Sequence, residues 1–119
     1  MVYWNNIHLS MGVLEEFFAG LEGFEWDEGN SDKNWRQHAV GQGEAEQTLL
    51  NRPLRVALDV KHSRQEPPFL ALGRTDALRP LTVAFTVRDT RVRVISARPM
   101  SRAERRVYAQ AQKHPEADS

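Results

Sequence analysis

The stretch RVRVISARPMSRAERRVYAQ, residues 91–110, carries the clearest structural signals in the chain. Its first half alternates apolar and polar residues, as a half-buried strand does. Pro99 predicts the end of that strand, because proline cannot donate a hydrogen bond to a sheet. Ser101 and Glu104 then have the spacing of a capping box, in which each side chain accepts a hydrogen bond from the other residue's backbone N–H. We therefore predict a strand followed directly by a helix that ends near Gln112.

The same region is strongly basic. Between Arg88 and Arg106 there are seven arginines and only two acids, Asp89 and Glu104. By contrast, residues 1–32 contain seven acids and no base, so the formal net charge of zero hides a marked segregation. A basic segment of this kind is typical of proteins that bind a polyanion, and RNA is the commonest one in the cytoplasm. The alternative is an ordinary solvated surface.

Length and composition limit the class of protein. A chain of 119 residues fits one domain with its own core. The absence of cysteine excludes disulfides and cysteine metal sites, and we expect no metal and no other cofactor. The N-terminus has Glu15 and Glu16 where a signal sequence is most apolar, and no segment approaches the roughly 20 apolar residues of a membrane span. We expect a soluble, cytoplasmic protein that does not interact with membranes.

The first half of the chain predicts helices. Apolar residues recur at helical spacing over residues 10–21, which form an acidic amphipathic helix. Residues 24–26 are extended, residues 29–30 are typical of a turn, and Asp32 is a suitable cap for a helix that ends at His38. A further short helix is expected over residues 44–50.

The second half predicts a sheet. Four alternating runs, LRVALDV, FLALG, LTVAFTVR and RVRVISA, are separated by short turns, which favours an antiparallel meander. The expected fold is α+β, with N-terminal helices packed on a four-stranded, mainly antiparallel sheet and a C-terminal helix. Helices would cover one face, and the other face, bordered by arginines, suits a single-stranded nucleic acid.

Several motifs resemble one family. FEWDEGNSDKNWRQHAV, residues 24–40, resembles the opening motif of the BrnT toxins, which runs Phe-Glu-Trp-Asp, a short helix with an Asn, then Arg-Lys-His-Gly. The segments LGR at 72–74, RPL at 79–81 and ISAR at 95–98 follow in the family's order, and the resemblance covers about residues 24–109. Two departures are Ala39, where the family has glycine, and Pro68, where it has arginine.

The resemblance implies a RelE-like fold and a metal-independent endoribonuclease toxin that halts translation. It also implies a partner, a ribbon-helix-helix antitoxin of the BrnA type, and binding of operator DNA only through the toxin–antitoxin complex. The domain would span residues 24–112, with residues 1–23 as an extra acidic amphipathic helix and 113–119 as a frayed tail. That leader would pack on the core, extend a homodimer or cover the basic sheet face.

RNA cleavage without a metal needs a base for the 2′-OH, cations for the phosphate and an acid for the leaving 5′ oxygen. Six residues are our candidates for this chemistry: His62 or Glu66 as the base, Arg79, Arg93 and Arg98 as a phosphate clamp, and Tyr108 as the acid. Six more basic residues are expected to bind RNA: Lys61, Arg64, Arg74, Arg88, Arg91 and Arg102.

Each candidate also has a structural interpretation. His62 is more typical of a surface position than of a catalytic base. Glu66 could be a partner for Arg64, and Tyr108 could be a packing residue. Trp26 and Trp35 are more typical of a core than of a base-stacking surface. An alternative function is a weakened or inactive relative that keeps only RNA binding or antitoxin binding. A third is a small adaptor whose acidic helix recruits another protein.

Overall fold

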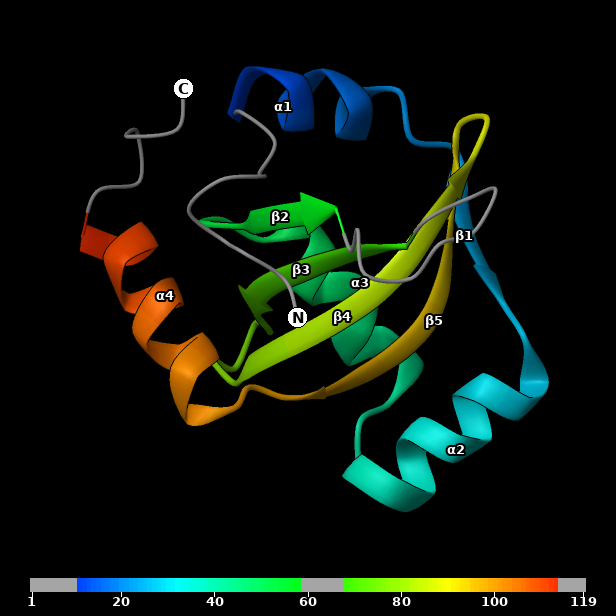
Figure 1. Ribbon diagram of the computed structural model, residues 1–119. Helices are drawn as coiled ribbons and strands as arrows, with labels where there is room; N and C mark the ends of the chain where they lie inside the picture. Colours follow the sequence, from blue (N-terminus) through cyan, green and yellow to red (C-terminus); the bar gives the residue numbers. More distant parts are fainter. Residues whose placement is uncertain (1–10, 59–67, 114–119) are drawn as a thin grey trace.

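One five-stranded mixed sheet organises the fold (Figure 1). The computed structural model describes residues 11–58 and 68–113, and the strand order is β1-β5-β4-β3-β2. No helix in these two ranges is long and apolar enough to cross a membrane. The elements in chain order are α1 (Met11–Ala19), β1 (Gly23–Trp26), α2 (Glu28–His38), α3 (Gln42–Leu50), β2 (Arg55–Leu58), β3 (Phe69–Arg74), β4 (Pro80–Arg88), β5 (Arg91–Pro99) and α4 (Arg102–Lys113).

Four strands form the predicted antiparallel meander, but the sheet has a fifth strand. β2, β3, β4 and β5 pair in chain order, and every pair is antiparallel. β1 joins the other side of β5 in parallel, from Gly23 opposite Arg91 to Trp26 opposite Val94. The predicted number of strands is therefore wrong. A strand of four residues is too short to show a period, and its partner lies far along the chain, so no local signal marks the pairing.

Helix α2 begins earlier than the sequence predicts. Its N-cap is Asp27, whose Oδ1 accepts a hydrogen bond from Gly29 N at 2.8 Å, and not Asp32. Gly29 and Asn30, predicted as a turn, lie in the first part of the helix. Both aspartates are good capping residues, but Asp27 directly follows β1 and already has the extended backbone that an N-cap requires.

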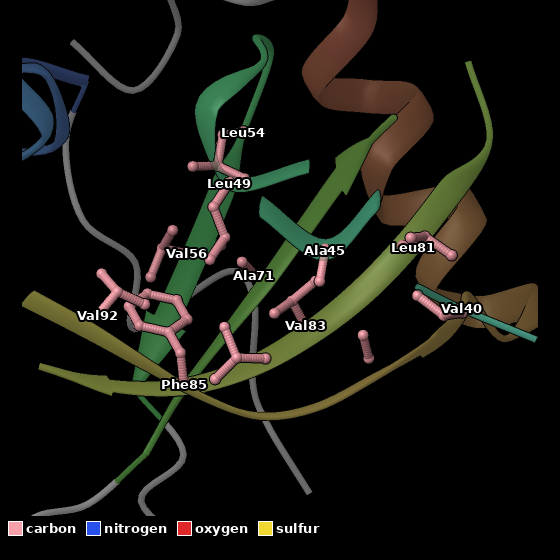
Figure 2. Close-up of a cluster of buried hydrophobic side chains, with 12 residues drawn as sticks. Val40, Ala45, Leu49, Leu54, Val56, Ala71, Leu81, Val83, Phe85 and Val92 are labelled. Carbon is pink, nitrogen blue, oxygen red and sulfur yellow. The ribbon is translucent and has the colours of Figure 1, made fainter. Parts of the chain in front are cut away.

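The hydrophobic core lies between α3 and one face of the sheet (Figure 2). Close approach of β3 to α3 depends on Gly73, because a Cβ at this position would lie 2.8 Å from Thr48 O. The buried side chains of this core are Val40, Ala45, Leu49, Leu54, Val56, Ala71, Leu81, Val83, Phe85, Val92, Val94 and Ala97.

Helix α1 adds to the same core. Phe17, Phe18 and Leu21 pack against it. Arg52 holds the helix in place: its guanidinium lies 5.3 Å from the centroid of the Phe18 ring, and its Nε donates to Glu15 Oε1 at 2.6 Å. Of the three placements expected for the acidic leader, its described part takes the first, which is packing on the core.

Helix α2 faces the sheet through Asn34 and turns Trp35 away from it. Asn34 is buried, and its Oδ1 accepts a hydrogen bond from Ala97 N at 3.2 Å. Because β1 ends opposite Val94, this side chain pairs with β5 on the side that β1 no longer covers. Trp26 packs against the core, whereas Trp35 is 61% exposed, so the core interpretation is wrong for Trp35.

Helix α4 covers one end of the opposite sheet face. Met100 and Tyr108 pack there against Leu72 of β3. The predicted capping box is confirmed, since Ser101 N donates to Glu104 Oε1 at 2.8 Å and Glu104 N donates to Ser101 Oγ at 3.1 Å. The strand-to-helix corner is therefore fixed by local hydrogen bonds.

The C-terminal cap of α2 generates a stability prediction. Ala39 has φ 52°, in the left-handed region that favours glycine. Ala39→Gly should raise the free energy of unfolding by about 1 kcal/mol because it removes the Cβ strain. Ala109→Gly, on the exposed side of α4, should lower it by about 1 kcal/mol. Urea titration of both variants measures the difference, and the same sign for both would contradict the explanation.

Candidate active site

An irregularity in β5 determines which side chains share a face of the sheet. Ala84 of β4 pairs with Ser96, but the next residue of β4, Phe85, pairs with Val94. Ile95 is thus an extra residue, a β-bulge. Side chains before and after Ile95 no longer follow one strict alternation.

The bulge brings Arg98 to the same side of the sheet as the other arginines of the last two strands. Buried positions in β5 fall at 92, 94 and 97, so the partly exposed arginines at 91, 93 and 98 share the other face. Arg88 of β4 pairs with Arg91 and belongs to the same face. We call Arg88, Arg91, Arg93 and Arg98 the basic face. An unbroken strand would have sent Arg98 to the side opposite Arg91 and Arg93.

Carboxylates from β1 and its end lie beside the basic face. Arg91 Nη1 is 3.7 Å from Glu25 Oε1, and Arg93 Nη2 is 3.7 Å from Asp27 Oδ2. Both pairs are partly exposed and longer than a good charge-assisted hydrogen bond, so their stabilising effect is small. A phosphate can displace either carboxylate at little cost.

Arg98 is held much more tightly. Its Nη1 and Nη2 donate to the two carboxylate oxygens of Glu104 at 2.7 and 2.9 Å. Thr82 Oγ1 also donates to Glu104 Oε1 at 2.9 Å. The Glu104 side chain is 13% exposed and that of Arg98 39%, so the pair is partly desolvated. A phosphate at Arg98 must therefore compete with a bidentate carboxylate.

The contacts of Glu104 change its acidity. Burial alone would raise the pKa of Glu104, but the hydrogen bonds from Arg98, Ser101 N and Thr82, together with the charge of Arg98, lower the pKa to about 2. The same hydrogen bond raises the pKa of Arg98 against the opposing effect of burial. Both groups are fully charged at neutral pH.

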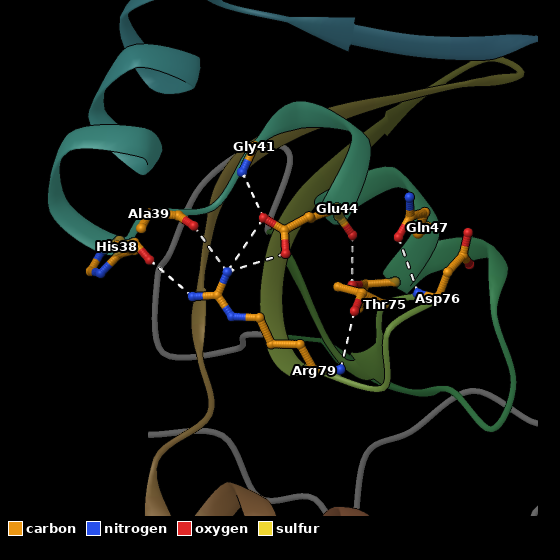
Figure 3. A network of polar contacts seen from close by, with 9 residues as sticks. His38, Ala39, Gly41, Glu44, Gln47, Thr75, Asp76 and Arg79 are labelled. Carbon is orange, nitrogen blue, oxygen red and sulfur yellow. Dashed lines mark hydrogen bonds and ion pairs between the residues drawn. The ribbon is translucent and has the colours of Figure 1, made fainter.

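Arg79 lies among the helices (Figure 3). Its Nη1 donates to Ala39 O at 2.9 Å and its Nη2 to His38 O at 3.1 Å, the last carbonyls of α2. Nη1 also meets both oxygens of Glu44, at 3.3 and 3.2 Å, and Glu44 Oε1 accepts from Gly41 N at 3.2 Å. Arg79 joins the α2–α3 connection to the start of β4 and is not part of the basic face.

Tyr108 is turned into the interior. Its hydroxyl donates to Pro53 O at 2.7 Å, and burial raises the pKa of Tyr108 to about 12, although the charge of Arg74 opposes the rise. A phenol held in this way favours the packing interpretation over the role of an acid. Arg74 donates through Nη2 to Arg52 O at 3.2 Å, and Arg102 is exposed on the first turn of α4.

Four predicted residues fall outside the described residues: Lys61, His62, Arg64 and Glu66. The chain leaves the sheet at Leu58 and re-enters it at Phe69, and these two residues pair with each other. Phe69 pairs with Phe85, which pairs with Val94, the neighbour of Arg93. The β2–β3 connection therefore starts and ends at the level of the sheet where Arg93 lies.

Sequence reasoning missed several members of this site. Glu25 and Asp27 were considered only as parts of a motif, and their contacts with arginines depend on the parallel pairing of β1. Thr86 and Ser96 pair with Arg93 and Ala84, and thus add two hydroxyl groups to the basic face. No local signal reports a bulge, so the alignment of these side chains was not predictable.

Comparison with known proteins identifies the family. Residues 26–104, well over half of the chain, match the family described as the ribonuclease toxin BrnT of type II toxin-antitoxin systems. The chain belongs to the BrnT family. The 1.1 Å crystal structure of the Brucella abortus ribonuclease toxin BrnT has the same fold, with a TM-score of 0.51 and 22% identity over 67% of this chain and 97% of that one. No curated protein matches the chain.

The BrnT match covers the basic face together with Asp27 and Glu104, and begins one residue after Glu25. Helix α1 precedes the matched residues. BrnT toxins of this class act as ribonucleases and have a cognate antitoxin. The resemblance in the sequence to the BrnT family is therefore confirmed, and the α+β fold with it.

The network of Arg79 generates a second prediction. Arg79→Ala should lower the free energy of unfolding by about 1–3 kcal/mol, because two helix carbonyls and Glu44 lose a charged donor. The matched control is Arg36→Ala, which removes an exposed arginine paired with Asp32 on α2 and should change stability by less than about 0.5 kcal/mol. Equal melting curves for the two variants would show that the Arg79 network is not structural.

The pair of Arg98 and Glu104 generates a third prediction. The pKa of Glu104 falls from 4.5 to about 2 on folding, so its stabilisation is present above pH 4.5 and is lost as pH falls toward 2. In Glu104→Gln, the loss of unfolding free energy between pH 6 and pH 2 should be smaller than in the parent by about 1–2 kcal/mol. This is less than the whole pKa shift would give, because Arg98 is partly solvated. Denaturant titrations from pH 6 to 2 test this. Glu16→Gln, an exposed control on α1, should keep the parent profile.

Proposed function

We propose that this chain is a metal-independent endoribonuclease that cleaves mRNA on the basic face and thereby inhibits translation. The observation that carries the proposal is the alignment of Arg88, Arg91 and Arg93 on one sheet face, in the regular part of the β4–β5 pair. Successive guanidinium groups along a strand pair suit the phosphates of a single-stranded RNA, and the loose contacts of Arg91 and Arg93 with carboxylates favour exchange for phosphate.

The proposed reaction is transfer of the phosphoryl group to the neighbouring ribose oxygen. A base takes the proton of the 2′-OH, the O2′–P bond forms, and the P–O5′ bond breaks. The products are a 2′,3′-cyclic phosphate and a 5′-hydroxyl, whose oxygen receives a proton from an acid. Arg93 and Arg91 stabilise the negative charge that builds up on the phosphoryl oxygens.

The base is proposed to come from the β2–β3 connection. His62 and Glu66 are the sequence candidates, and the connection is anchored at Leu58 and Phe69, at the same level of the sheet as Arg93. Tyr108 is no longer our preferred acid, because its hydroxyl is committed to Pro53 O. A protonated His62 is the group we propose to protonate the leaving 5′ oxygen.

A second candidate function is a weakened BrnT relative that binds RNA or antitoxin without cleaving RNA. The observation that favours it is that two arginines of the predicted phosphate clamp already bind carboxylates of the chain itself. Arg98 is paired with Glu104, and Arg79 with Glu44. Pro68 also stands where the resemblance expects an arginine. Only Arg93 of the predicted clamp retains a loose partner.

The proposed setting is cytoplasmic, where mRNA and ribosomes are found. The proposed partner is a BrnA-like ribbon-helix-helix antitoxin, with operator DNA bound only through the toxin–antitoxin complex. A RelE-like relationship of the fold is part of the same proposal, and the antiparallel β2–β5 meander supports it.

Cleavage of a defined RNA tests the proposed function. The purified protein should cut an unstructured oligoribonucleotide in EDTA, and Arg93→Ala should slow cleavage about 100-fold through loss of charge stabilisation. Arg36→Ala, which removes an exposed arginine of α2, should cleave like the parent. Affinity should fall with salt, with a slope of about −0.7 per phosphate contacted.

The outcomes separate the two candidates. Binding that depends on salt and on Arg93, with no cleavage, would favour the weakened relative. A flat salt response with no cleavage would exclude both RNA cleavage and RNA binding, and would leave only antitoxin binding.

A further inference from the structure

A cavity lies where α4 meets the end of the sheet, apart from the contacts of the basic face. Its volume is about 320 Å³, and it is lined by Arg74, Leu78, Pro80, Met100, Arg105 and Tyr108. Three of these side chains are aliphatic and supply an apolar surface, while two are arginines. The cavity is therefore an apolar pocket with positive charge at its margin.

The two arginines of the pocket differ in their partners from three other arginines of the fold. In the described part of the chain, Arg52, Arg79 and Arg98 each have a carboxylate within 4.0 Å. Arg74 donates to a backbone carbonyl, Arg52 O, and Arg105 Nε approaches Met100 O at 3.5 Å; no described carboxylate pairs with either. The pocket thus offers positive charge without an internal anion.

Leu78 forms an exposed, fixed wall of the pocket. It is 67% exposed and has φ 67°, a left-handed conformation that is unfavourable for a leucine. Its N–H donates to Thr75 O at 2.9 Å, and Asp76 in the same turn is held by Asn51 Nδ2 at 2.9 Å and Gln47 Oε1 at 3.0 Å. The surrounding structure holds a strained residue with its apolar side chain in solvent, which is typical of functional sites.

A second hollow continues the pocket. It has a volume of about 270 Å³, shares Arg74 and Leu78 with the first, and is also lined by Arg52, Asn51, Thr75 and Asp76. Leu78 therefore stands between two depressions that follow the β3–β4 turn. An extended or helical segment can place neighbouring side chains in both.

The chemistry of the lining favours a peptide over RNA. Nucleotides are usually held by stacking of bases on exposed aromatic rings. Among the described residues that line the pocket, the only aromatic ring is that of Tyr108, which is 3% exposed and whose hydroxyl donates to Pro53 O. Aliphatic surface beside unpaired guanidinium groups is complementary to an apolar side chain flanked by carboxylates.

We propose that this pocket docks an acidic amphipathic segment of a protein partner, with one apolar side chain on Leu78, Pro80 and Met100 and carboxylates on Arg74 and Arg105. The inference rests on the proposed function for the identity of that partner, which is the cognate antitoxin. The segment would lie against α4, where the residue before Arg105 is Glu104, the partner of Arg98. Docking here therefore places an acidic chain next to one end of the basic face.

Two variants test the pocket without disturbing the fold. Leu78→Gly removes the apolar wall and suits the left-handed backbone, so it should not destabilise the protein. Arg105→Glu reverses an exposed charge. The control is Arg106→Glu, the same change on the next exposed residue of α4, which does not line the pocket.

The probe is the antitoxin polypeptide encoded in the toxin's own operon. The dissociation constant of its complex with the parent and with each variant is measured at fixed salt. Leu78→Gly and Arg105→Glu should each weaken binding about tenfold or more, with Arg106→Glu close to the parent. Unchanged affinity in both pocket variants would overturn the proposal.

RNA binding by the same variants separates the two claims. A loss of RNA affinity with intact antitoxin binding would assign the pocket to RNA and overturn the docking proposal. If the pocket variants lose antitoxin binding and the parent protein does not cleave RNA, the docking proposal stands and only the catalytic proposal is refuted.

Discussion

The extra residue in β5 is the constraint on which the candidate site depends. Strand geometry allows each side chain only two directions, and Ile95 resets that choice half-way along the strand. The core receives Val92 and Val94 before the bulge and Ala97 after it, without a gap in burial. The arginines on the other face are consequently collected from positions that a regular strand would have divided. One backbone irregularity thus serves both the packing and the surface.

Acidic and basic residues that are separated along the sequence lie close together in the folded chain. The acidic N-terminal residues come to lie beside the basic C-terminal strands, because β1 pairs in parallel with β5. Glu25 and Asp27 then moderate the field of Arg91 and Arg93 at distances too long for strong pairing. Arg98 and Arg79 are instead absorbed into partly buried networks. The arginines of the basic face therefore differ in how tightly they are paired: Arg91 and Arg93 have long contacts with carboxylates, and Arg98 has a short one.

The features that could be predicted from the sequence are those that depend on residues close together in the chain. The antiparallel meander, the end of β5 at Pro99 and the capping box of Ser101 and Glu104 depend on neighbours in sequence, and all were predicted correctly. The pairing of β1, the bulge at Ile95 and the hydrogen bonds of Arg79 depend on residues far apart in the chain. An arginine that binds RNA and one that binds helix carbonyls look the same in a sequence. Only the fold distinguishes them.

The hydrogen bond from Ala97 N to Asn34 Oδ1 has a consequence for association between molecules. Beyond Trp26 the side of β5 that faces away from β4 is no longer paired with a strand, and a bare row of amides is a template for pairing with a second chain. The Asn34 side chain of α2 binds one of these amides, Ala97 N, and a side chain offers no backbone with which a further strand could pair. This part of the β5 edge is therefore less open to the addition of a strand from a second molecule.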